Sequence, residues 1–375
     1  MSFKHRIVLT GGGTGGHVYP ALAVAEQLKG DKSIEALLYI GAAGHLEEKL
    51  AAQHQLEFVG LASSGLPRQL SLKLVTWPFQ FLAAVLAAQK ILARFRPTVI
   101  LGTGGYASAP PLVAALLSDV PYAIHEPDAH PGLVNRFLAC HARLISLGMA
   151  GAHEQFQNTK AQIIINGNPI SKRFLHLPEK GKALAELGLV AGRKTVVITG
   201  GSQGALALNQ AVFDMLPMIR EAGIQIVHQV GEKNWDLLKQ KVDPEFLQSD
   251  FYRPRKYFEN LEVAYAVSDL TICRAGAMTI AELFVTGTPA IFVPYPFAAQ
   301  DHQTFNARFV ESLGGAQVIP QSELTGTRLY QMVLGLLSNE DKLAKMKKQM
   351  LSLAKPEAAS DIANQLKQLS VGAGL

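Results

Sequence analysis

Short apolar runs alternate with longer amphipathic stretches along the chain, and glycine-rich loops join many of them. Residues 7–10 form an apolar, β-rich run that enters a glycine loop over residues 11–16. An alanine-rich stretch with helical spacing follows over residues 18–28. The same order recurs where residues 195–199 enter a second glycine loop over residues 200–205. This pattern predicts units of strand, loop and helix, whose strands lie parallel in a sheet.

The two halves of the chain echo each other beyond these first units. The second predicted strand is followed by a glycine in each half, Gly41 and Gly231. Further strand candidates follow in the same order, at residues 98–101 and 121–124 in the first half and at 270–273 and 289–293 in the second. The echo predicts an α/β fold of two Rossmann-like domains. Because open parallel sheets bind ligands beyond the carboxyl ends of their strands, where the glycine loops fall, we expect both sheets to face an interdomain cleft.

The length of the chain also favours two domains, because 375 residues exceed what one hydrophobic core usually holds. Gly167-Asn168-Pro169 interrupts the chain before a charged segment, which places the boundary near residue 165. We therefore expect a first domain over residues 1–165 and a second over residues 166–349. The closing helical segment, about residues 350–375, is expected to pack back on the first domain.

Composition and charge narrow the class of protein. Hydrophobic residues make up 48% and charged residues 17%, which favours a globular chain over a disordered one. The formal net charge of +5 indicates a surface that attracts anions such as phosphates or acidic lipid head groups. No aromatic-rich basic motif supports nucleic-acid binding. Cys140 and Cys273 lack metal-ligand spacing, so we predict neither a zinc site nor a disulfide, and a reducing cytoplasm suits both.

The longest wholly apolar stretch covers residues 81–88. A membrane-spanning helix requires about 18 or more apolar residues, so this stretch is too short for one. We therefore predict that the chain does not span a membrane.

The first glycine loop is compatible with several classes of nucleotide-binding protein. The residues around it distinguish between these classes. Gly11, Gly13 and Gly16 satisfy the dinucleotide-binding pattern, so a dehydrogenase is one alternative. A dehydrogenase needs an acidic side chain at the end of the second strand, and Tyr39-Ile40-Gly41 offers none. His17 stands where the lysine of a nucleotide triphosphatase loop is required. What remains is a loop whose main-chain N–H groups can approach a diphosphate at a helix start.

Two places in the first half offer acid-base chemistry. His17 closes the glycine loop and can deprotonate a hydroxyl, since the unperturbed pKa of histidine lies near working pH, although it can equally form a hydrogen bond at a helix start. Glu126-Pro127-Asp128 is a close carboxylate pair beside a strand end, where it can hold a metal, act as acid or base, or form a turn. No Asp-x-Asp motif occurs, so metal-assisted release of a nucleotide is not favoured.

The second half offers groups suited to a sugar nucleotide. Ser202 can bind a phosphate or cap the following helix. Glu282 can accept both hydroxyls of a ribose or serve as a first-turn helix acid. A dense polar group suits the reading of sugar hydroxyls, or alternatively an exposed loop that enters a helix: Gln300, Asp301, His302, Gln303 and Asn306.

Together these motifs resemble those of one enzyme family. The chain is similar, through nearly its whole length, to the peptidoglycan N-acetylglucosaminyltransferases of glycosyltransferase family 28, which act on undecaprenyl-pyrophosphoryl-muramyl-pentapeptide. The matching motifs are Gly12-Gly13-Thr14-Gly15-Gly16-His17 with Pro20, Gly104-Gly105-Tyr106, His125-Glu126, Gly167-Asn168-Pro169, residues 200–205, residues 274–282, and His302-Gln303 with Asn306. The resemblance implies the GT-B fold, inverting transfer of N-acetylglucosamine from UDP-N-acetylglucosamine, and no metal or other cofactor.

The resemblance also implies which residues form the site. His17 and Glu126 would be catalytic, with His17 the base for the acceptor hydroxyl. The uracil would lie by Phe258, the phosphates by Ser202, and the sugar by Gln303 and Asn306. The full set implied to bind substrate is Thr14, Gly15, Gly16, Asp128, Ser171, Ser202, Phe258, Arg274, Ala277, Met278, Thr279, Ile280, Ala281, Glu282, Gln303 and Asn306.

The chain departs from the family's motifs at two points. The family's His-Glu-Gln-Asn is His125-Glu126-Pro127-Asp128 here, so a carboxylate that can only accept replaces an amide. The family's Gly-Asn-Pro-Val-Arg ends in Ser171, so an arginine near the donor is replaced, and Lys172 or Arg173 can supply the charge. The alternatives are therefore a related glycosyltransferase with another donor or lipid acceptor, and a non-catalytic protein that binds a nucleotide sugar.

A lipid-linked acceptor implies a peripheral enzyme at the cytoplasmic face of the inner membrane. An apolar group with basic neighbours can rest on an anionic membrane surface, or it can be the core face of a buried helix. Its members are Leu72, Leu74, Val75, Trp77, Phe79, Phe81 and Leu82, with Arg68, Lys73 and Lys90 close in sequence.

Overall fold

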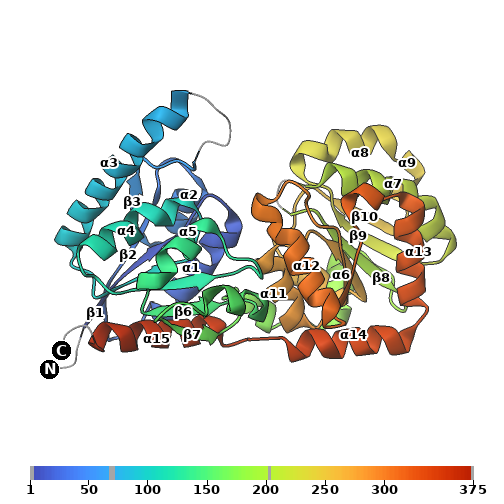
Figure 1. Cartoon of the computed structure of the whole chain (residues 1–375). Helices are drawn as coiled ribbons and strands as arrows, with labels where there is room; N and C mark the ends of the chain where they lie inside the picture. Colours follow the sequence, from blue (N-terminus) through green and yellow to red (C-terminus); the bar gives the residue numbers. More distant parts are fainter. Residues whose placement is uncertain (1–3, 67–71, 202–203, 373–375) are drawn as a thin grey trace. The chain divides into compact units, whose positions relative to one another are not determined.

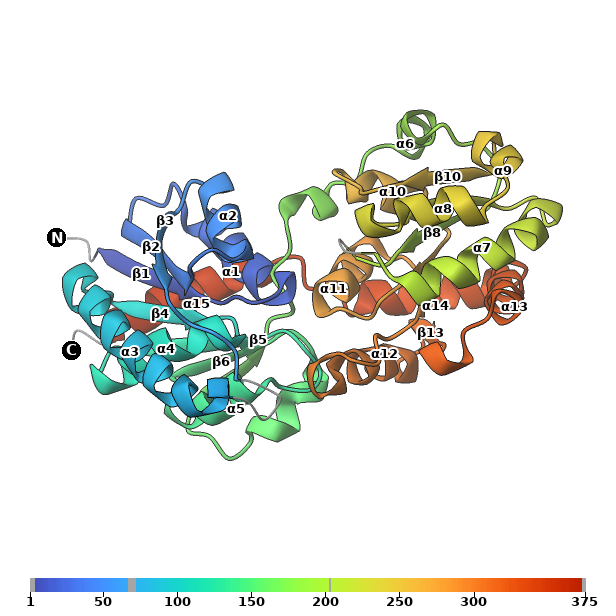
Figure 2. The ribbon, with the colours of Figure 1, turned by 90° about the horizontal axis from the view of Figure 1, so that it is seen from above.

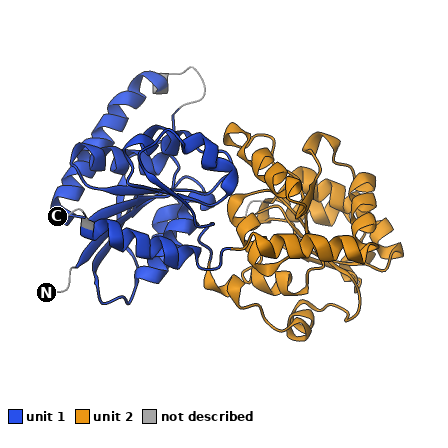
Figure 3. Cartoon of the chain, turned by 60° about the horizontal axis from the view of Figure 1, so that its bottom comes forward, with its two compact units in different colours: residues 1–170, 355–375 blue, residues 171–354 orange. Residues whose placement is uncertain are grey.

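The computed structural model describes residues 4–66, 72–201 and 204–372 (Figure 1). The chain forms two compact units, one of residues 1–170 with 355–375 and one of residues 171–354 (Figure 3). The predicted boundary near residue 165 and the observed one at residue 170 bracket Gly167-Asn168-Pro169. The chain returns to unit 1 at Lys355.

Unit 1 is built on a sheet of seven parallel strands in the order β3-β2-β1-β4-β5-β6-β7. In that order the strands are Glu57–Leu61, Ile34–Ala42, His5–Thr10, Val99–Gly102, Tyr122–Glu126, Leu144–Leu147 and Gln162–Ile165. The central strands are buried on both faces, which explains their continuous apolar runs.

Helices cover both faces of this sheet (Figure 1 and Figure 2). The core on one face includes side chains of α1 (Gly15–Leu28), α2 (Leu46–Gln53) and α15 (Ala358–Gly372). The core on the other face includes side chains of α3 (Leu72–Phe95), α4 (Ala109–Leu117) and α5 (Leu133–Leu138).

The closing helix α15 is fastened to unit 1 by polar contacts as well as by its apolar face. Asn166 and Gln365 exchange two hydrogen bonds of 2.8 and 3.0 Å through their side-chain amides. Lys367 lies 2.9 Å from Asp31, and this contact, ahead of hydrogen bonds from Ser33, holds the pKa of the Asp31 carboxyl well below its usual range.

Unit 2 contains six parallel strands in the order β10-β9-β8-β11-β12-β13. In that order they are Tyr252–Arg255, Gln225–Gln229, Thr195–Thr199, Leu270–Cys273, Ala290–Phe292 and Ala316–Val318. Both sheets have the doubly wound strand order of a Rossmann-like domain. The principal helices of the unit are α6 (Lys180–Leu187), α7 (Leu206–Glu221), α8 (Trp235–Lys241), α9 (Pro244–Gln248), α10 (Leu261–Val267), α11 (Ala277–Thr286), α12 (His302–Ser312), α13 (Gly326–Leu337) and α14 (Glu340–Ser352).

Helix α3 corrects the expectation that no segment is long enough to cross a membrane. Among the described residues, one helical segment, residues 74–95, meets the length and composition of a membrane span, with a mean hydropathy of 1.3. A wholly apolar stretch was too narrow a criterion, because Thr76, Gln80 and Gln89 interrupt the run without ending the helix. The second half of α3 nonetheless packs Val85 and Leu92 into the core of unit 1.

Candidate functional site

Three helices that follow glycine loops have N-termini suited to an anion. Within the described residues, no side chain caps the first N–H groups of α1, α7 or α11, and the first turns of these helices contain no acidic residue. Helices α6, α9, α13 and α14 of unit 2, by contrast, are capped by Glu179, Asp243, Thr325 and Asn339. Because the N–H groups of a helix start and the helix dipole attract negative charge, these three starts, each preceded by a glycine loop, are candidate phosphate sites.

The first glycine loop is held by the loop that follows β4. The N–H of Gly12 donates to the carbonyl of Gly104 at 3.3 Å, and Thr103 Oγ1 donates to the carbonyl of His17 at 2.5 Å. A Cβ atom at Gly11 would come within 2.0 Å of Thr103 Oγ1. The close approach of the two loops therefore requires glycine at this position, as the sequence pattern indicated.

His17 lies in the first turn of α1 and is half-buried, with its ring against the loop that follows β4. Its Nδ1 is 3.2 Å from Thr14 Oγ1, which orients the imidazole. Cβ atoms at Gly104 and Gly105 would each come within 2.9 Å of the ring, so both glycines make room for it. The helix-start hydrogen bond is present, and the ring also packs against the glycines of the loop that follows β4.

The carboxylate of Glu126 is buried and is surrounded by N–H donors of its own loop. It accepts hydrogen bonds from the main-chain N–H groups of Asp128 at 3.0 Å and Gly132 at 3.1 Å, and from Asn135 Nδ2 at 2.8 Å. Burial, and then the nearby charge of Asp128, raise the pKa of the Glu126 carboxyl. Through these contacts Glu126 fixes the conformation of residues 127–132. Of the interpretations of the Glu126 and Asp128 pair as a metal site, an acid or base, or a turn, they favour the turn.

Asn135 is a site residue that the sequence did not reveal. It is 2% exposed, and its Oδ1 has no hydrogen-bond partner within the described part of the chain. Its Nδ2 lies 3.3 Å from the position of a Cβ at Gly104, beside the His17 ring. A buried side-chain acceptor without a protein partner is uncommon, which makes Asn135 a candidate for contact with a bound ligand. Its only sequence signal is its place on the helix after the Glu126 loop.

Two of the family motifs meet inside unit 1. His125 is fully buried, with Nε2 2.9 Å from Asn168 Oδ1 and Nδ1 3.1 Å from Ser146 Oγ. Asn168 Nδ2 donates to the carbonyl of Pro127 at 3.0 Å. Burial lowers the pKa of His125 to about 4, so this imidazole is neutral. Its contact with Asn168 joins the His125-Glu126 motif to the Gly167-Asn168-Pro169 motif. Asp128 is 6% exposed and follows Pro127, whose carbonyl accepts the hydrogen bond from Asn168.

In unit 2 the second glycine loop is joined to the predicted uracil site. Gln229, at the end of β9, donates to the carbonyl of Gly201 at 2.8 Å and accepts from the main-chain N–H of Phe258 at 3.0 Å. Phe258 is 7% exposed. Ser202 lies outside the described residues.

Several other predicted residues of unit 2 lie in the loop at residues 274–276 and in the helix α11 that follows it. Ala277, Ile280 and Ala281 are buried, and the N–H of Ile280 donates to the carbonyl of Gly276 at 3.0 Å, whereas Met278 and Thr279 are half-buried. Asn306 is fully buried and donates to the carbonyl of Ala275 at 3.2 Å.

Arg274 and Gln303 hold neighbouring main chain in the structure. The Arg274 guanidinium donates to the carbonyls of Val293 and Pro294 at 2.9 and 3.0 Å, and to Gln321 Oε1 at 2.6 Å. Gln303 Oε1 accepts from the N–H of Tyr295 at 3.0 Å. Both side chains therefore shape the segment after β12 in this conformation.

Glu282 is not a first-turn helix acid, which corrects that alternative. It lies in the second turn of α11, half-buried, with the hydroxyl of Tyr265 3.5 Å from Oε2. Burial raises the pKa of the Glu282 carboxyl to about 8. A carboxyl with a raised pKa that is not part of an ion pair is typical of a ligand-binding position.

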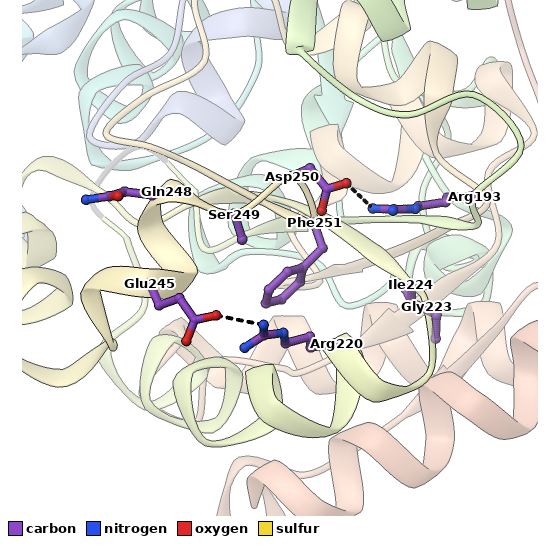
Figure 4. A pocket seen from close by; sticks show the side chains of 9 residues that line it. All are labelled: Arg193, Arg220, Gly223, Ile224, Glu245, Gln248, Ser249, Asp250 and Phe251. Atoms are coloured by element: carbon purple, nitrogen blue, oxygen red, sulfur yellow. Dashed lines mark hydrogen bonds and ion pairs between the residues drawn. The ribbon is translucent and has the colours of Figure 1, made fainter.

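A pocket of about 440 Å³ lies at the amino ends of the strands of unit 2, away from the glycine loops (Figure 4). Two ion pairs border it, Arg193 with Asp250 at 2.9 Å and Arg220 with Glu245 at 2.7 Å. Because parallel sheets bind their ligands at the carboxyl ends of the strands, we do not assign the sugar nucleotide to this pocket.

Comparison with known proteins places the chain among glycosyltransferases. Residues 7–145 match the glycosyltransferase family 28 N-terminal domain, and residues 195–366 match the glycosyltransferase family 28 C-terminal domain. A protein of Halothermothrix orenii named "UDP-N-acetylglucosamine--N-acetylmuramyl-(pentapeptide) pyrophosphoryl-undecaprenol N-acetylglucosamine transferase" is 38% identical, over 98% of this chain and 100% of that protein. A protein of Desulfitobacterium hafniense with the same name is 34% identical, over 96% and 98%.

Among solved structures, that of Acinetobacter baumannii MurG is similar with a TM-score of 0.78 and 26% identity, over 97% of this chain and 99% of that chain. The fold and these matches make the protein a glycosyltransferase of the GT-B class. Within that class, the chain belongs to glycosyltransferase family 28. The resemblance inferred from the motifs is confirmed, and the dehydrogenase alternative is set aside.

Proposed function

We propose that this enzyme transfers N-acetylglucosamine from UDP-N-acetylglucosamine to the 4-hydroxyl of a lipid-linked N-acetylmuramyl-pentapeptide, with inversion, during peptidoglycan synthesis. The observation that carries the proposal is near full-length similarity, at 34–38% identity, to proteins named for this reaction. The starts of α1, α7 and α11, each preceded by a glycine loop, support the proposal because such helix starts attract the charge of a nucleotide diphosphate.

In the proposed mechanism, unit 2 binds the donor. The main-chain N–H groups at the start of α11 bind the diphosphate and stabilise the charge that develops as UDP leaves. Phe258 flanks the uracil, and Glu282 accepts the ribose hydroxyls. Gln303 and Asn306 fix the sugar from α12, where Asn306 contacts the loop before α11 and Gln303 contacts the segment after β12.

Unit 1 supplies the acid-base chemistry. The 4-hydroxyl of the acceptor attacks the anomeric carbon, the bond from that carbon to the diphosphate breaks, and His17 takes the hydroxyl proton. The 3.2 Å contact between His17 Nδ1 and Thr14 Oγ1 orients the imidazole for this step. Glu126 serves this step by holding its loop, with Asn135 between that loop and His17.

The departure at Ser171 leaves the donor with less positive charge than the family motif provides. Arg173 does not replace the missing arginine freely, because its Nη1 donates to the carbonyl of Glu259 at 3.0 Å and its Nε lies 3.5 Å from Glu262. Lys172 is exposed and is the remaining cation of this segment. We therefore propose that the main-chain N–H groups carry more of the phosphate binding in this enzyme than in relatives with the arginine.

A membrane-facing surface of α3 fits the lipid-linked acceptor. Val75, Phe79, Leu82 and Leu86 are 50–72% exposed and recur at helical spacing, so they form one apolar stripe. Lys90 and Arg94 follow on the exposed side of the same helix. Such a stripe with basic residues at one end is suited to the surface of an anionic membrane, and we propose that it holds the enzyme, as a peripheral protein, at the cytoplasmic face of the inner membrane.

The test is to supply labelled UDP-N-acetylglucosamine with a lipid-linked muramyl-pentapeptide and to look for the disaccharide product. Parallel reactions contain other UDP-sugars, or diacylglycerol in place of the muramyl lipid. Product from one of those combinations alone would identify a related glycosyltransferase instead. Binding of UDP-N-acetylglucosamine without turnover by any acceptor would identify a non-catalytic protein.

A further inference from the structure

A carboxylate that the proposed mechanism does not use lies beneath the first glycine loop. Glu47, in the first turn of α2, is fully buried. Its Oε1 accepts a 3.1 Å hydrogen bond from the N–H of Ala42, at the end of β2. Its Oε2 accepts a 3.4 Å hydrogen bond from the N–H of Gly13, in the middle of the glycine loop. One side chain thus joins the second strand to the loop that ends at His17.

The main chain around Glu47 is shaped to admit this carboxylate. A Cβ atom at Gly12 would lie 2.2 Å from Glu47 Oε1, and a Cβ atom at Gly41 would lie 2.7 Å from Glu47 Cγ. Two glycines from different segments are therefore required by the position of one side chain. Gly13 itself has a φ of 85°, a conformation that needs glycine and that the hydrogen bond to Glu47 helps to fix.

Other contacts bind the same loop on either side of Gly13. Tyr39 donates to the carbonyl of Gly11 at 2.8 Å, at the beginning of the loop. Thr103 donates to the carbonyl of His17, at its end. The N–H of Gly13 between them is held by Glu47. A buried carboxylate that accepts main-chain N–H groups forms stronger hydrogen bonds than a neutral side chain would.

We infer that Glu47 is a positioning residue that fixes the middle of the first glycine loop, and through it the Thr14–Gly16 main chain and His17. The inference rests on the proposed function for the role of that loop. Replacement by glutamine preserves the volume but exchanges one acceptor oxygen for an NH₂ group. That NH₂ group faces a main-chain donor, so one of the two hydrogen bonds is lost.

The experiment compares Glu47→Gln with Glu48→Gln. Glu48 is a matched control because it is the next residue of α2, is exposed, and also accepts a main-chain hydrogen bond, from Gly44 at 2.6 Å. Hydrogen exchange of the peptide covering residues 10–18 should be roughly tenfold faster in Glu47→Gln than in the wild type, and unchanged in Glu48→Gln. In the transfer assay kcat should fall roughly tenfold, with less than about a twofold change in the donor KM.

Unchanged exchange together with an unchanged kcat in a folded Glu47→Gln protein would overturn the inference. An equal loss in kcat and donor affinity would also overturn it, because that pattern describes general loosening of the protein. If Glu47→Gln does not fold, Glu47→Asp keeps the charge but withdraws it by one methylene, and the same exchange and kcat changes should appear in part. If the wild type transfers no N-acetylglucosamine, the proposed function fails, while the exchange comparison still decides whether Glu47 holds the loop.

Discussion

The side-chain oxygen of Gln229 accepts a 3.0 Å hydrogen bond from the main-chain N–H of Phe258. The Nε2 of Gln229 donates to the carbonyl of Gly201 at 2.8 Å, and the residue is 3% exposed. One buried amide therefore ties the residue proposed to flank the uracil to the loop proposed to approach the phosphates. The proposed sites for the two ends of UDP are therefore joined by the same side chain.

Replacing Gln229 with Leu should weaken the binding of UDP about tenfold, because both main-chain groups lose their partner. Uridine and inorganic diphosphate, each of which uses one end of the site, should lose less. Isothermal titration calorimetry with the three ligands measures the difference. Gln240→Leu, at an exposed position of α8, is the control and should bind UDP as the wild type does. Equal losses for all three ligands would contradict the coupling.

Replacing His17 with Ala should lower kcat by about 10²- to 10⁴-fold, the usual contribution of a general base, with little change in donor affinity. Thr14→Val, which removes the 3.2 Å contact to Nδ1, should produce a smaller loss because the base remains but is less well oriented. Steady-state kinetics with saturating donor and acceptor measures both effects. A wild-type kcat in His17→Ala would remove His17 from the mechanism.

The raised pKa of Glu282 predicts a proton release when donor binds. Burial raises this pKa to about 8, so at pH 7 the carboxyl is mostly protonated in the free enzyme. Accepting two ribose hydroxyls favours the ionised form, so UDP affinity should increase as the pH rises from 6 to about 8 and then level off. Calorimetry at pH 7 in buffers with different ionisation enthalpies should detect the released proton. Glu282→Gln should bind UDP more weakly and without proton release; a wild type that releases none would contradict the assignment.

The same pKa has a consequence for folding. A carboxyl whose pKa is higher in the folded state than in the unfolded state stabilises the fold fully below the unfolded pKa, and this stabilisation is lost as the pH rises through about 8. Ligand-free protein should therefore lose roughly 3–4 kcal/mol of unfolding free energy from this group between pH 5 and pH 8. Urea denaturation of Glu282→Gln should show a flatter dependence over that range.

The sequence was a good guide to features that depend on local pattern. Each strand that ends in a glycine loop is visible in the chain because the apolar run, the glycines and the helix are contiguous. Residues 7–10 and 195–199, for example, coincide with the buried parts of β1 and β8. The family motifs could also be read directly, because their residues lie within short windows.

Features that depend on distant contacts could not be predicted. Glu47 and Gly13 are 34 residues apart and meet only because β1 and β2 are neighbours in the sheet. Gln229 and Phe258 are 29 residues apart and meet across β9 and β10 in the same way. The place of Glu282 was misjudged for a related reason, since the pattern did not show that α11 already begins at Ala277.

The paired amides of Asn166 and Gln365 predict a measurable coupling between the main body of unit 1 and its closing helix. Replacing either residue with Ala should destabilise the protein by about 1–3 kcal/mol, because the other amide is left unpaired in a mostly buried setting. The double replacement should cost less than the sum of the two single ones. A double-mutant cycle by urea denaturation measures the coupling. Additive single effects would mean that the two hydrogen bonds do not contribute.

The exposed stripe on α3 predicts binding to lipid vesicles. Replacing Phe79 and Leu82 together with Ser should reduce the bound fraction at least tenfold, because burying each side chain contributes about 1.5–3 kcal/mol. Lys90→Gln should weaken binding only to vesicles with anionic lipid, by about 1 kcal/mol. Leu334→Ser, at an exposed apolar position of α13, is the control for a change of surface hydrophobicity away from the stripe. Cosedimentation with neutral and with phosphatidylglycerol-containing vesicles separates the apolar contribution from the charge contribution. Binding at the wild-type level by the variant with Phe79 and Leu82 replaced would show that the stripe does not contact the membrane.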